Sequence, residues 1–351
     1  MENPCENIEN MVRYSKRYYF KRRKFLMDIL TNTMIDAGKK DDEVSGIVFM
    51  RYLKRQLSNN NVPYLSGEIE TGSKYSVVMW NKCKEYKDFE DGLMNELVFV
   101  IGNINDFGGR KSLHLSHIKV LDAVAEGIDV DSLKCLKYNK EVYQKSTIDF
   151  MQKHVSQKAF ELLDKIMDFN SDSGIWSRFY VEYAAKAIHD NCEVGLLAHT
   201  YKCLRMVEFI QKPYSFMNNM HTAEITEKED ISDLIYMGVF LHDVGKIYEM
   251  NEGIYSDDGF NTHRILGAEL LFKFKEEIVS TYNEHWYQAL LSIIIGHHHE
   301  FGDTAKTIYA YIVYMIDQME STLTAFDQLI NEELTSIPGS KITWDDNVLN
   351  L

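Results

Sequence analysis

The sequence predicts an α+β protein with several domains, in which a small β-barrel precedes an all-α helical bundle. The chain has 351 residues, more than one hydrophobic core usually holds. Residues 45–122 combine short apolar runs with frequent glycine, as strands joined by tight turns do. From Trp176 to about Asp327 apolar residues recur at helical spacing, and this stretch has a single proline, Pro213.

Composition and hydrophobic periodicity divide the chain into five parts. We expect a basic helical N-terminal arm, an OB-like domain that binds nucleic acid, a helical connector, a metal-dependent phosphohydrolase domain and a C-terminal tail. Their predicted bounds are 1–44, 45–122, 123–175, 176–330 and 331–351.

The N-terminal arm carries the basic excess of the chain. Residues 1–60 hold twelve Lys and Arg against eight Asp and Glu, and most of the excess lies in Ser15–Lys24, where three aromatic residues lie between basic ones. Such a stretch suits a phosphate backbone, and it equally suits a solvated helix face.

Short strand-like runs define the second part. Ser76–Trp80 and Leu97–Gly102 are apolar, Gly108-Gly109 suits a tight turn, and Leu113 and Leu115 then alternate with polar residues. About five short strands within so few residues predict a small barrel, and the OB-fold is the natural candidate.

The connector and the bundle show helical periodicity. In the connector, Phe160, Leu163 and Met167 share one helix face with Leu162 and Ile166. In the bundle we expect helices over the following ranges: Gly195 to Ile210, Ile231 to Leu241, His263 to Phe274, Trp286 to Ile295 and Tyr309 to Phe326.

Composition limits the class of protein. The five cysteines form no CxxC pair, which argues against a zinc ribbon or a disulfide framework and favours a reducing compartment. No apolar run approaches the length of a membrane helix, and the N-terminus is polar, so we expect a cytoplasmic protein without membrane contact. A net charge of −15 disfavours a general nucleic-acid coat protein, but not an enzyme that handles nucleic acid locally.

The pair His242-Asp243 is the centre of the candidate site. His199 precedes it by 43 residues, His263 follows Asp243 by 20, His297 lies 34 further on, and Asp317 lies 20 beyond His297. Several of these residues follow buried apolar runs, where unpartnered ionisable groups would be costly and a metal would supply the partner. The order H…HD…H…H…D resembles that of the HD-domain metal phosphohydrolases, so we expect an HD-domain helical bundle.

Two divalent ions are expected, because two ions can bind the attacking and leaving oxygens in phosphodiester hydrolysis. His199, His242, Asp243 and Asp317 would hold one ion; His263 and His297, with His298 as a further candidate, would hold the other. Asp243 would bridge them. Mixed imidazole and carboxylate ligands suit manganese, which we favour, and also iron, cobalt or zinc.

Asp243 and Lys246 are the predicted catalytic residues. Lys246, one helical turn after Asp243, is placed to meet a phosphate oxygen. The alternative interpretation is an ordinary lysine at a helix end. His189, His299 and Glu300 are weaker candidates at the rim. A lone histidine is usually structural, so the remaining ones carry no prediction.

Five segments are similar to motifs of the YhaM-type 3′–5′ exoribonucleases. They are Ala184–His189, Gly195–Thr200, Phe240–Lys246, His263–Leu271 and Gly296–Gly302. Ile316–Glu320 stands where that family has a DxLD-type segment, and residues 67–113 are similar to the OB-fold that precedes its HD domain. The resemblance spans about residues 45–330. The chain differs from the family at three places. Ala198 stands where the family has Glu, Asp190 stands where the family often has a second His, and the loop after His298 is shorter.

The resemblance implies a manganese-favouring exonuclease that trims single-stranded RNA, and in some members DNA, from the 3′ end. Trp80, Phe107, Arg110 and Lys111 would then stack bases and bind phosphates, although Trp80 and Phe107 equally suit core packing. Two other functions stay open: hydrolysis of a nucleotide or cyclic nucleotide, and single-strand binding by a protein whose HD site is residual. Assembly into a homo-oligomer is also open.

Overall fold

The computed structural model places the chain in two compact units, Met1–Cys135 and Leu136–Leu351. It describes residues 28–107, 110–135, 138–185, 190–211, 213–214, 220, 222, 224–255, 261–298, 303–331, 343–345 and 348–350. The basic stretch Ser15–Lys24 and the predicted turn at Gly108-Gly109 lie outside these residues.

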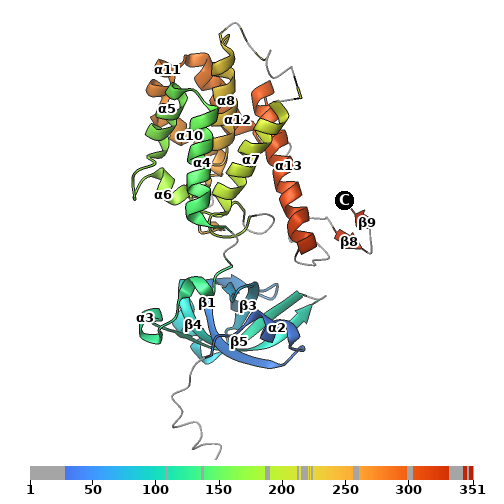
Figure 1. Ribbon diagram of the computed structural model, residues 1–351. Coiled ribbons are helices and arrows are strands. Elements are labelled where there is room, and N and C mark those ends of the chain that lie inside the picture. Colours follow the sequence, from blue (N-terminus) through green and yellow to red (C-terminus); the bar gives the residue numbers. More distant parts are fainter. Residues whose placement is uncertain are drawn as a thin grey trace, which may run out of the picture. The chain divides into compact units, whose positions relative to one another are not determined.

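The first unit is a closed five-stranded barrel (Figure 1). Its strands are β1 (Glu43–Leu57), β2 (Pro63–Glu70), β3 (Lys74–Trp80), β4 (Leu93–Phe107) and β5 (Arg110–Val120). The order around the barrel is β1-β2-β3-β5-β4, with β3 and β5 parallel and the other neighbours antiparallel. A closed five-stranded barrel of this kind confirms the predicted OB-like fold.

Every second side chain along the strands points into the barrel and fills it. Tyr75, Val77 and Met79 of β3 point inward, as do Leu113 and Leu115 of β5, and the intervening side chains are more exposed. β1 and β4 each have a register irregularity, at Met50/Tyr52 and at Ile101/Gly102, which lets long strands curve around the closed barrel.

Short helices border the barrel. They are α2 (Asn32–Ala37), η1 (Lys84–Phe89), α3 (Ala123–Glu126) and η2 (Val130–Ser132). The side chain of Thr31 caps α2, and Leu121 and Leu133 pack with Ile47, Phe49 and Leu97 on the outside of β1 and β4.

The second unit is helical (Figure 1). Its helices are α4 (Lys140–His154), α5 (Gln157–Met167), α6 (Ile175–Phe179), α7 (Gly195–Gln211), α8 (Lys228–Leu241), α9 (Lys246–Glu249), α10 (His263–Lys273), α11 (Lys275–Thr281), α12 (Glu284–Gly296) and α13 (Ile308–Asn331). They share one apolar core, in which α8 contacts α7, α12 and α13. The predicted order of a barrel followed by a helical bundle is therefore confirmed.

A small hairpin interrupts the helices, so the prediction of an entirely helical stretch from Trp176 to Asp327 was wrong there. Strands β6 (Met250–Asn251) and β7 (Ile254–Tyr255) are joined by Glu252 and Gly253, both with positive φ. The Glu182 carboxylate accepts hydrogen bonds from both of these backbone N–H groups. This contact spans about 70 residues of sequence, so local periodicity could not reveal it.

The predicted connector, 123–175, is divided between the two units. α3 and Leu133 pack on the barrel, whereas α4 and α5 contribute Phe150, Leu162 and Leu163 to the core of the bundle. After α13 the structure describes one further hairpin, β8 (Thr343–Asp345) with β9 (Val348–Asn350).

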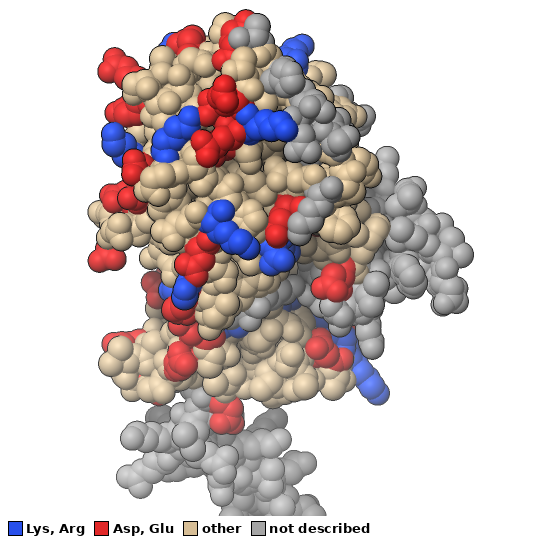
Figure 2. Space-filling view, turned by 45° about the horizontal axis from the view of Figure 1, so that its top comes forward, with Lys and Arg blue, Asp and Glu red and all other residues tan. Residues whose placement is uncertain are grey.

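The surface carries both signs of charge. On the face that Figure 2 shows, Lys and Arg side chains lie among Asp and Glu side chains, with broad uncharged areas between them. Among the described residues no helix is both long enough and apolar enough to span a membrane.

Candidate metal centre

Helix ends bring most of the predicted ligands together. His242 directly follows α8, His297 directly follows α12, and His263 is the first residue of α10. His199 lies in the second turn of α7, and Asp317 lies on α13. Five segments that are distant in sequence therefore meet at one place in the bundle.

One group of ligand atoms consists of His199, His242 and Asp317. The Nε2 atom of His199 lies 3.3 Å from Nε2 of His242 and 3.2 Å from Oδ1 of Asp317. Both imidazoles are fully buried, and Asp317 is 8% exposed.

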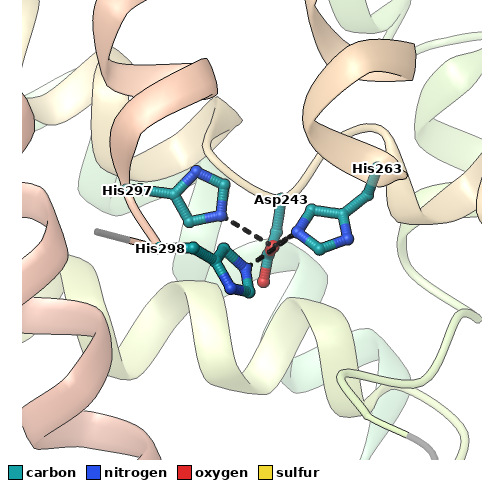
Figure 3. A group of neighbouring side chains, drawn as sticks. All are labelled: Asp243, His263, His297 and His298. Atoms are coloured by element: carbon teal, nitrogen blue, oxygen red, sulfur yellow. Dashed lines mark hydrogen bonds and ion pairs between the residues drawn. The ribbon is translucent and has the colours of Figure 1, made fainter. Parts of the chain in front are cut away.

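A second group consists of Asp243, His263, His297 and His298 (Figure 3). Nε2 of His263 lies 2.9 Å from Nε2 of His298, and Nε2 of both His263 and His297 lies 3.6 Å from Oδ1 of Asp243. Figure 3 shows the three imidazoles converging on this carboxylate.

Asp243 faces both groups. Its Oδ2 atom lies 3.2 Å from Nε2 of His242 and 3.7 Å from Nε2 of His199, whereas Oδ1 faces His263 and His297. One carboxylate thus presents one oxygen to each group, which is the geometry that a bridging ligand needs.

The residues fit a divalent cation. Asp243 Oδ1 and His297 Nε2 are buried and have no hydrogen-bond partner among the described residues. Four imidazoles direct Nδ1 away from the centre: His242 to the carbonyl of Val239 at 2.7 Å, His297 to that of Ile294 at 2.8 Å, His199 to Glu320 and His263 to Glu249. Each Nδ1–H can then donate outward, which leaves the Nε2 lone pair for a metal.

Electrostatics keep the carboxylates ionised. Burial alone would raise the pKa of Asp243, but the Lys246 ammonium and then His242 outweigh it and hold that pKa well below its usual value. Burial likewise opposes ionisation of Asp317, and its hydrogen bond with His199 helps to lower its pKa. Burial lowers the pKa of His298 to about 3, so this imidazole is neutral at pH 7, as a ligand must be.

Lys246 lies beside Asp243 and follows the turn after α8. Its Nζ atom donates to Asp243 Oδ2 and to the backbone carbonyl of Ala184, both at 2.6 Å. Its side chain is 12% exposed. The lysine therefore already has a carboxylate and a carbonyl as partners and balances the charge of Asp243.

Three acidic or sulfur-containing side chains at the centre were absent from the sequence-based ligand set. Glu320 and Glu249 contact Nδ1 of His199 and His263, and Cys203 Sγ lies 3.7 Å from His199 Nε2. Burial raises the pKa of Cys203 to about 12. Helical spacing could have indicated two of these residues. Glu320 is three residues after Asp317 and Cys203 is four after His199, so each shares a helix face with a predicted ligand.

The four candidate nucleic-acid residues lie on β3, β4 and β5 and differ in environment. Phe107 is 83% exposed, Arg110 is exposed, and Trp80 is half-buried against Tyr64, with ring centroids 5.2 Å apart. Lys111 instead directs Nζ to the backbone carbonyls of Ile35, Asp36 and Gly38 around the end of α2. The structure thus brings Phe107 and Arg110 to the same end of the β4–β5 pair, where they are partners in register, and uses Lys111 to hold α2.

His189, His299 and Glu300 lie outside the described residues, as does the loop after His298. Ala198, where the related family has Glu, is fully buried. Asp190 accepts hydrogen bonds from Tyr138 and Lys202 and so belongs to a network behind the centre.

Residues 198–322 match the family model described as "HD domain". All the predicted metal ligands lie within this range. Curated proteins match over both units. The chain is 22% identical over 283 residues to a "3′-5′ exoribonuclease YhaM" from Listeria welshimeri, covering 78% of this chain and 83% of the relative. The predicted resemblance to the YhaM-type exoribonucleases is confirmed.

Other YhaM relatives match similarly. The one from Listeria innocua is 24% identical over 286 residues, covering 78% of this chain and 83% of its own. The one from Oceanobacillus iheyensis is 22% identical over 307 residues, covering 83% of this chain and 88% of its own. Because the second unit contains 216 of the 351 residues, these matches extend into the barrel unit.

One solved structure is titled "Structure and Conformational Change of a Replication Protein A Heterotrimer Bound to ssDNA". It is 19% identical, covering 26% of this chain and 67% of its own, with a TM-score of 0.19. A TM-score this low supports no statement about the present chain.

Proposed function

We propose that this protein is a metal-dependent 3′–5′ exonuclease that degrades single-stranded RNA to mononucleotides, with single-stranded DNA as a second substrate to be tested. The YhaM relatives, which are named for 3′–5′ exoribonuclease activity, and the HD match support the reaction class. The matches extend into both units, which supports an enzyme that uses the barrel as well as the HD region.

The observation that carries the proposal is the placement of Asp243 between two groups of imidazole and carboxylate ligands. A single structural metal would need only one closed set of ligands. Two neighbouring sets that share one carboxylate are typical of enzymes that cleave phosphodiester bonds.

His199, His242, Asp243 and Asp317 would hold one divalent ion, and Asp243, His263, His297 and His298 the other. Two bound ions would lower the pKa of an attacking water and stabilise charge on the phosphate oxygens. Nitrogen and oxygen donors suit manganese, which we favour, as well as iron, cobalt or zinc. The buried thiol of Cys203 is the one soft donor close to these ligands among the described residues.

The protein's own groups have separate tasks. Asp243 would give one carboxylate oxygen to each ligand group, and Lys246 keeps that carboxylate ionised. On the barrel, the exposed ring of Phe107 would stack on a base, with Arg110 beside it for the phosphates. Trp80 offers a second ring next to Tyr64. Lys111 would act indirectly, by fixing α2.

The test is hydrolysis of a 5′-labelled single-stranded RNA and a matched DNA, each with Mn²⁺ and with EDTA. We expect a Mn²⁺-dependent ladder that shortens from the 3′ end. We expect its loss in Asp243→Ala, because both ligand groups lose their shared oxygen donor. Asp149→Ala, which removes an exposed carboxylate on α4, is the control.

Oligomers that stay intact with manganese, iron, cobalt and zinc would contradict the proposal. Hydrolysis of nucleotides or cyclic nucleotides alone would then favour a nucleotidase, and binding without hydrolysis would favour a single-strand-binding protein with a residual site. A cytoplasmic location, a homo-oligomer and the role of the basic arm stay predictions.

A further inference from the structure

Two glutamates lie behind the candidate metal centre, on the outer side of its imidazoles. Glu320 on α13 accepts from Nδ1 of His199, and Glu249 at the end of α9 accepts from Nδ1 of His263 at 2.7 Å. His242 and His297 direct Nδ1 to backbone carbonyls instead. Each of the two ligand groups therefore contains one imidazole backed by a carboxylate and one backed by a carbonyl.

We propose that Glu320 and Glu249 are positioning residues, each serving one of the two ions: Glu320 through His199 and Glu249 through His263. The inference rests on the two-ion centre of the proposed function. A carboxylate that accepts from Nδ1–H fixes the imidazole tautomer, holds the ring in its plane and makes Nε2 a stronger donor to a metal. A backbone carbonyl carries no full charge and polarises its ring less.

Glu320 is itself held from a second side. Its Oε1 atom lies 2.7 Å from Lys202 Nζ and accepts from the hydroxyl of Thr324. Lys202 also contacts Asp190 at 2.8 Å, and all of these contacts lie within the bundle. The side chain of Glu320 is 1% exposed, so its orientation and charge are both determined by these partners.

Glu249 is less constrained. Its side chain is 14% exposed, and it lies at the end of the four-residue helix α9, just before the β6–β7 hairpin. We therefore expect the larger effect on metal affinity from Glu320 and a smaller effect in the same direction from Glu249.

The experiment is a titration of the full-length, metal-free protein with Mn²⁺, in which free Mn²⁺ is measured by electron paramagnetic resonance. The parent should bind two ions. Glu320→Gln should weaken one binding step by roughly 10- to 100-fold and leave the other near its parent value, and Glu249→Gln should weaken the other step by roughly tenfold. Neither glutamate belongs to the two ligand groups that share Asp243, so neither substitution removes a ligand atom of those groups.

A double-mutant comparison assigns each glutamate to its ion. Glu320→Gln should add little loss of affinity to His199→Ala but should add its full effect to His263→Ala. Glu249→Gln should show the reverse. Non-additivity within a pair and additivity across pairs is what two separate supports predict.

Asp233→Asn is the matched control. Asp233 is a buried carboxylate on α8 that accepts from the backbone and hydroxyl of Ser156 and from Tyr282. It contacts no candidate ligand, so its loss should leave both binding steps unchanged. If Glu320→Gln fails to fold, as judged by circular dichroism, the partly exposed Glu249→Gln still tests the proposal.

Parent-like binding of both ions by both glutamine variants would overturn the proposal, as would equal weakening of both steps by each variant. A parent that binds neither Mn²⁺ nor Fe²⁺, Co²⁺ or Zn²⁺ would overturn this proposal and the proposed function together. A parent that binds two ions with the expected variant effects but cleaves no RNA would overturn the proposed function alone.

Discussion

At the scale of single residues, charge balance around Asp243 is the main feature. Asp243 is 2% exposed, and Lys246 is the nearest cation, at 2.6 Å. A buried carboxylate that loses its cation is costly, because the desolvation penalty stays while the attraction is lost. Lys246 thus stabilises the metal-free protein, and a bound divalent ion would do the same for the charge of Asp243.

Lys246→Met should therefore lower the stability of the metal-free protein, by about 3–5 kcal/mol. Added Mn²⁺ should raise its melting temperature by more than it raises that of the parent, because the ion replaces the missing positive charge. Thermal unfolding with EDTA and with Mn²⁺ measures both effects. Lys145→Met, which breaks an exposed pair with Asp149, is the control, and equal Mn²⁺-induced rises in parent and variant would contradict this account.

At the scale of elements, close backbone contact places α10 against the turn that follows α8. A Cβ atom on Gly245 would lie 1.9 Å from the carbonyl oxygen of His263 and 2.6 Å from the backbone nitrogen of Gly267. Since His263 begins α10, the absence of a side chain at Gly245 sets the distance between this imidazole and Asp243. This accounts for glycine in the segment His242–Lys246 by packing, without any unusual backbone angle.

Gly245→Ala should move the start of α10 away from the centre. We expect a loss of stability of roughly 1–3 kcal/mol from overpacking, together with weaker Mn²⁺ binding. Thermal unfolding and metal titration of the same sample check both. A variant that melts and binds Mn²⁺ like the parent would show that α10 tolerates the shift. Gly127→Ala is the control: its added Cβ would meet nothing within 4 Å, but the positive φ of this residue on the barrel unit strains alanine, so this variant should lose stability and still bind Mn²⁺ like the parent.

At the scale of the whole molecule, the proposed function assigns separate tasks to the two units: the barrel would bind the single strand and the bundle would hydrolyse it. Phe107 is the most exposed of the candidate rings, and it stands at the end of β4. An exposed ring contributes little to the folded core, so its removal tests binding with little effect on folding.

Phe107→Ala should weaken single-stranded RNA binding by roughly 5- to 150-fold, the range for loss of one base-stacking ring. Hydrolysis of a small chromogenic phosphodiester, which needs no stacking platform, should stay at the parent rate. Fluorescence anisotropy and a colorimetric assay measure the two. Val124→Ala, which removes another exposed apolar side chain of the same unit, is the control. Unchanged RNA affinity in Phe107→Ala would remove this ring from the proposed binding surface.

Patterns in the chain were enough to predict the barrel and the helices α7, α8, α10, α12 and α13, because strand alternation and helical periodicity are properties of neighbouring residues. The short helices α9 and α11 were not predicted. The order and spacing of the motifs indicated the residues at 199, 242, 243, 263, 297 and 317 as candidate ligands. Contacts between distant segments were not predictable in this way. Glu320 and Glu249 meet their histidines only after α7, α9, α10 and α13 have packed. The same holds for the β6–β7 hairpin held by Glu182, and for Lys111, which was expected at a phosphate and instead caps α2. Partner choice for a polar side chain depends on which segments pack around it, and that is a property of the folded chain.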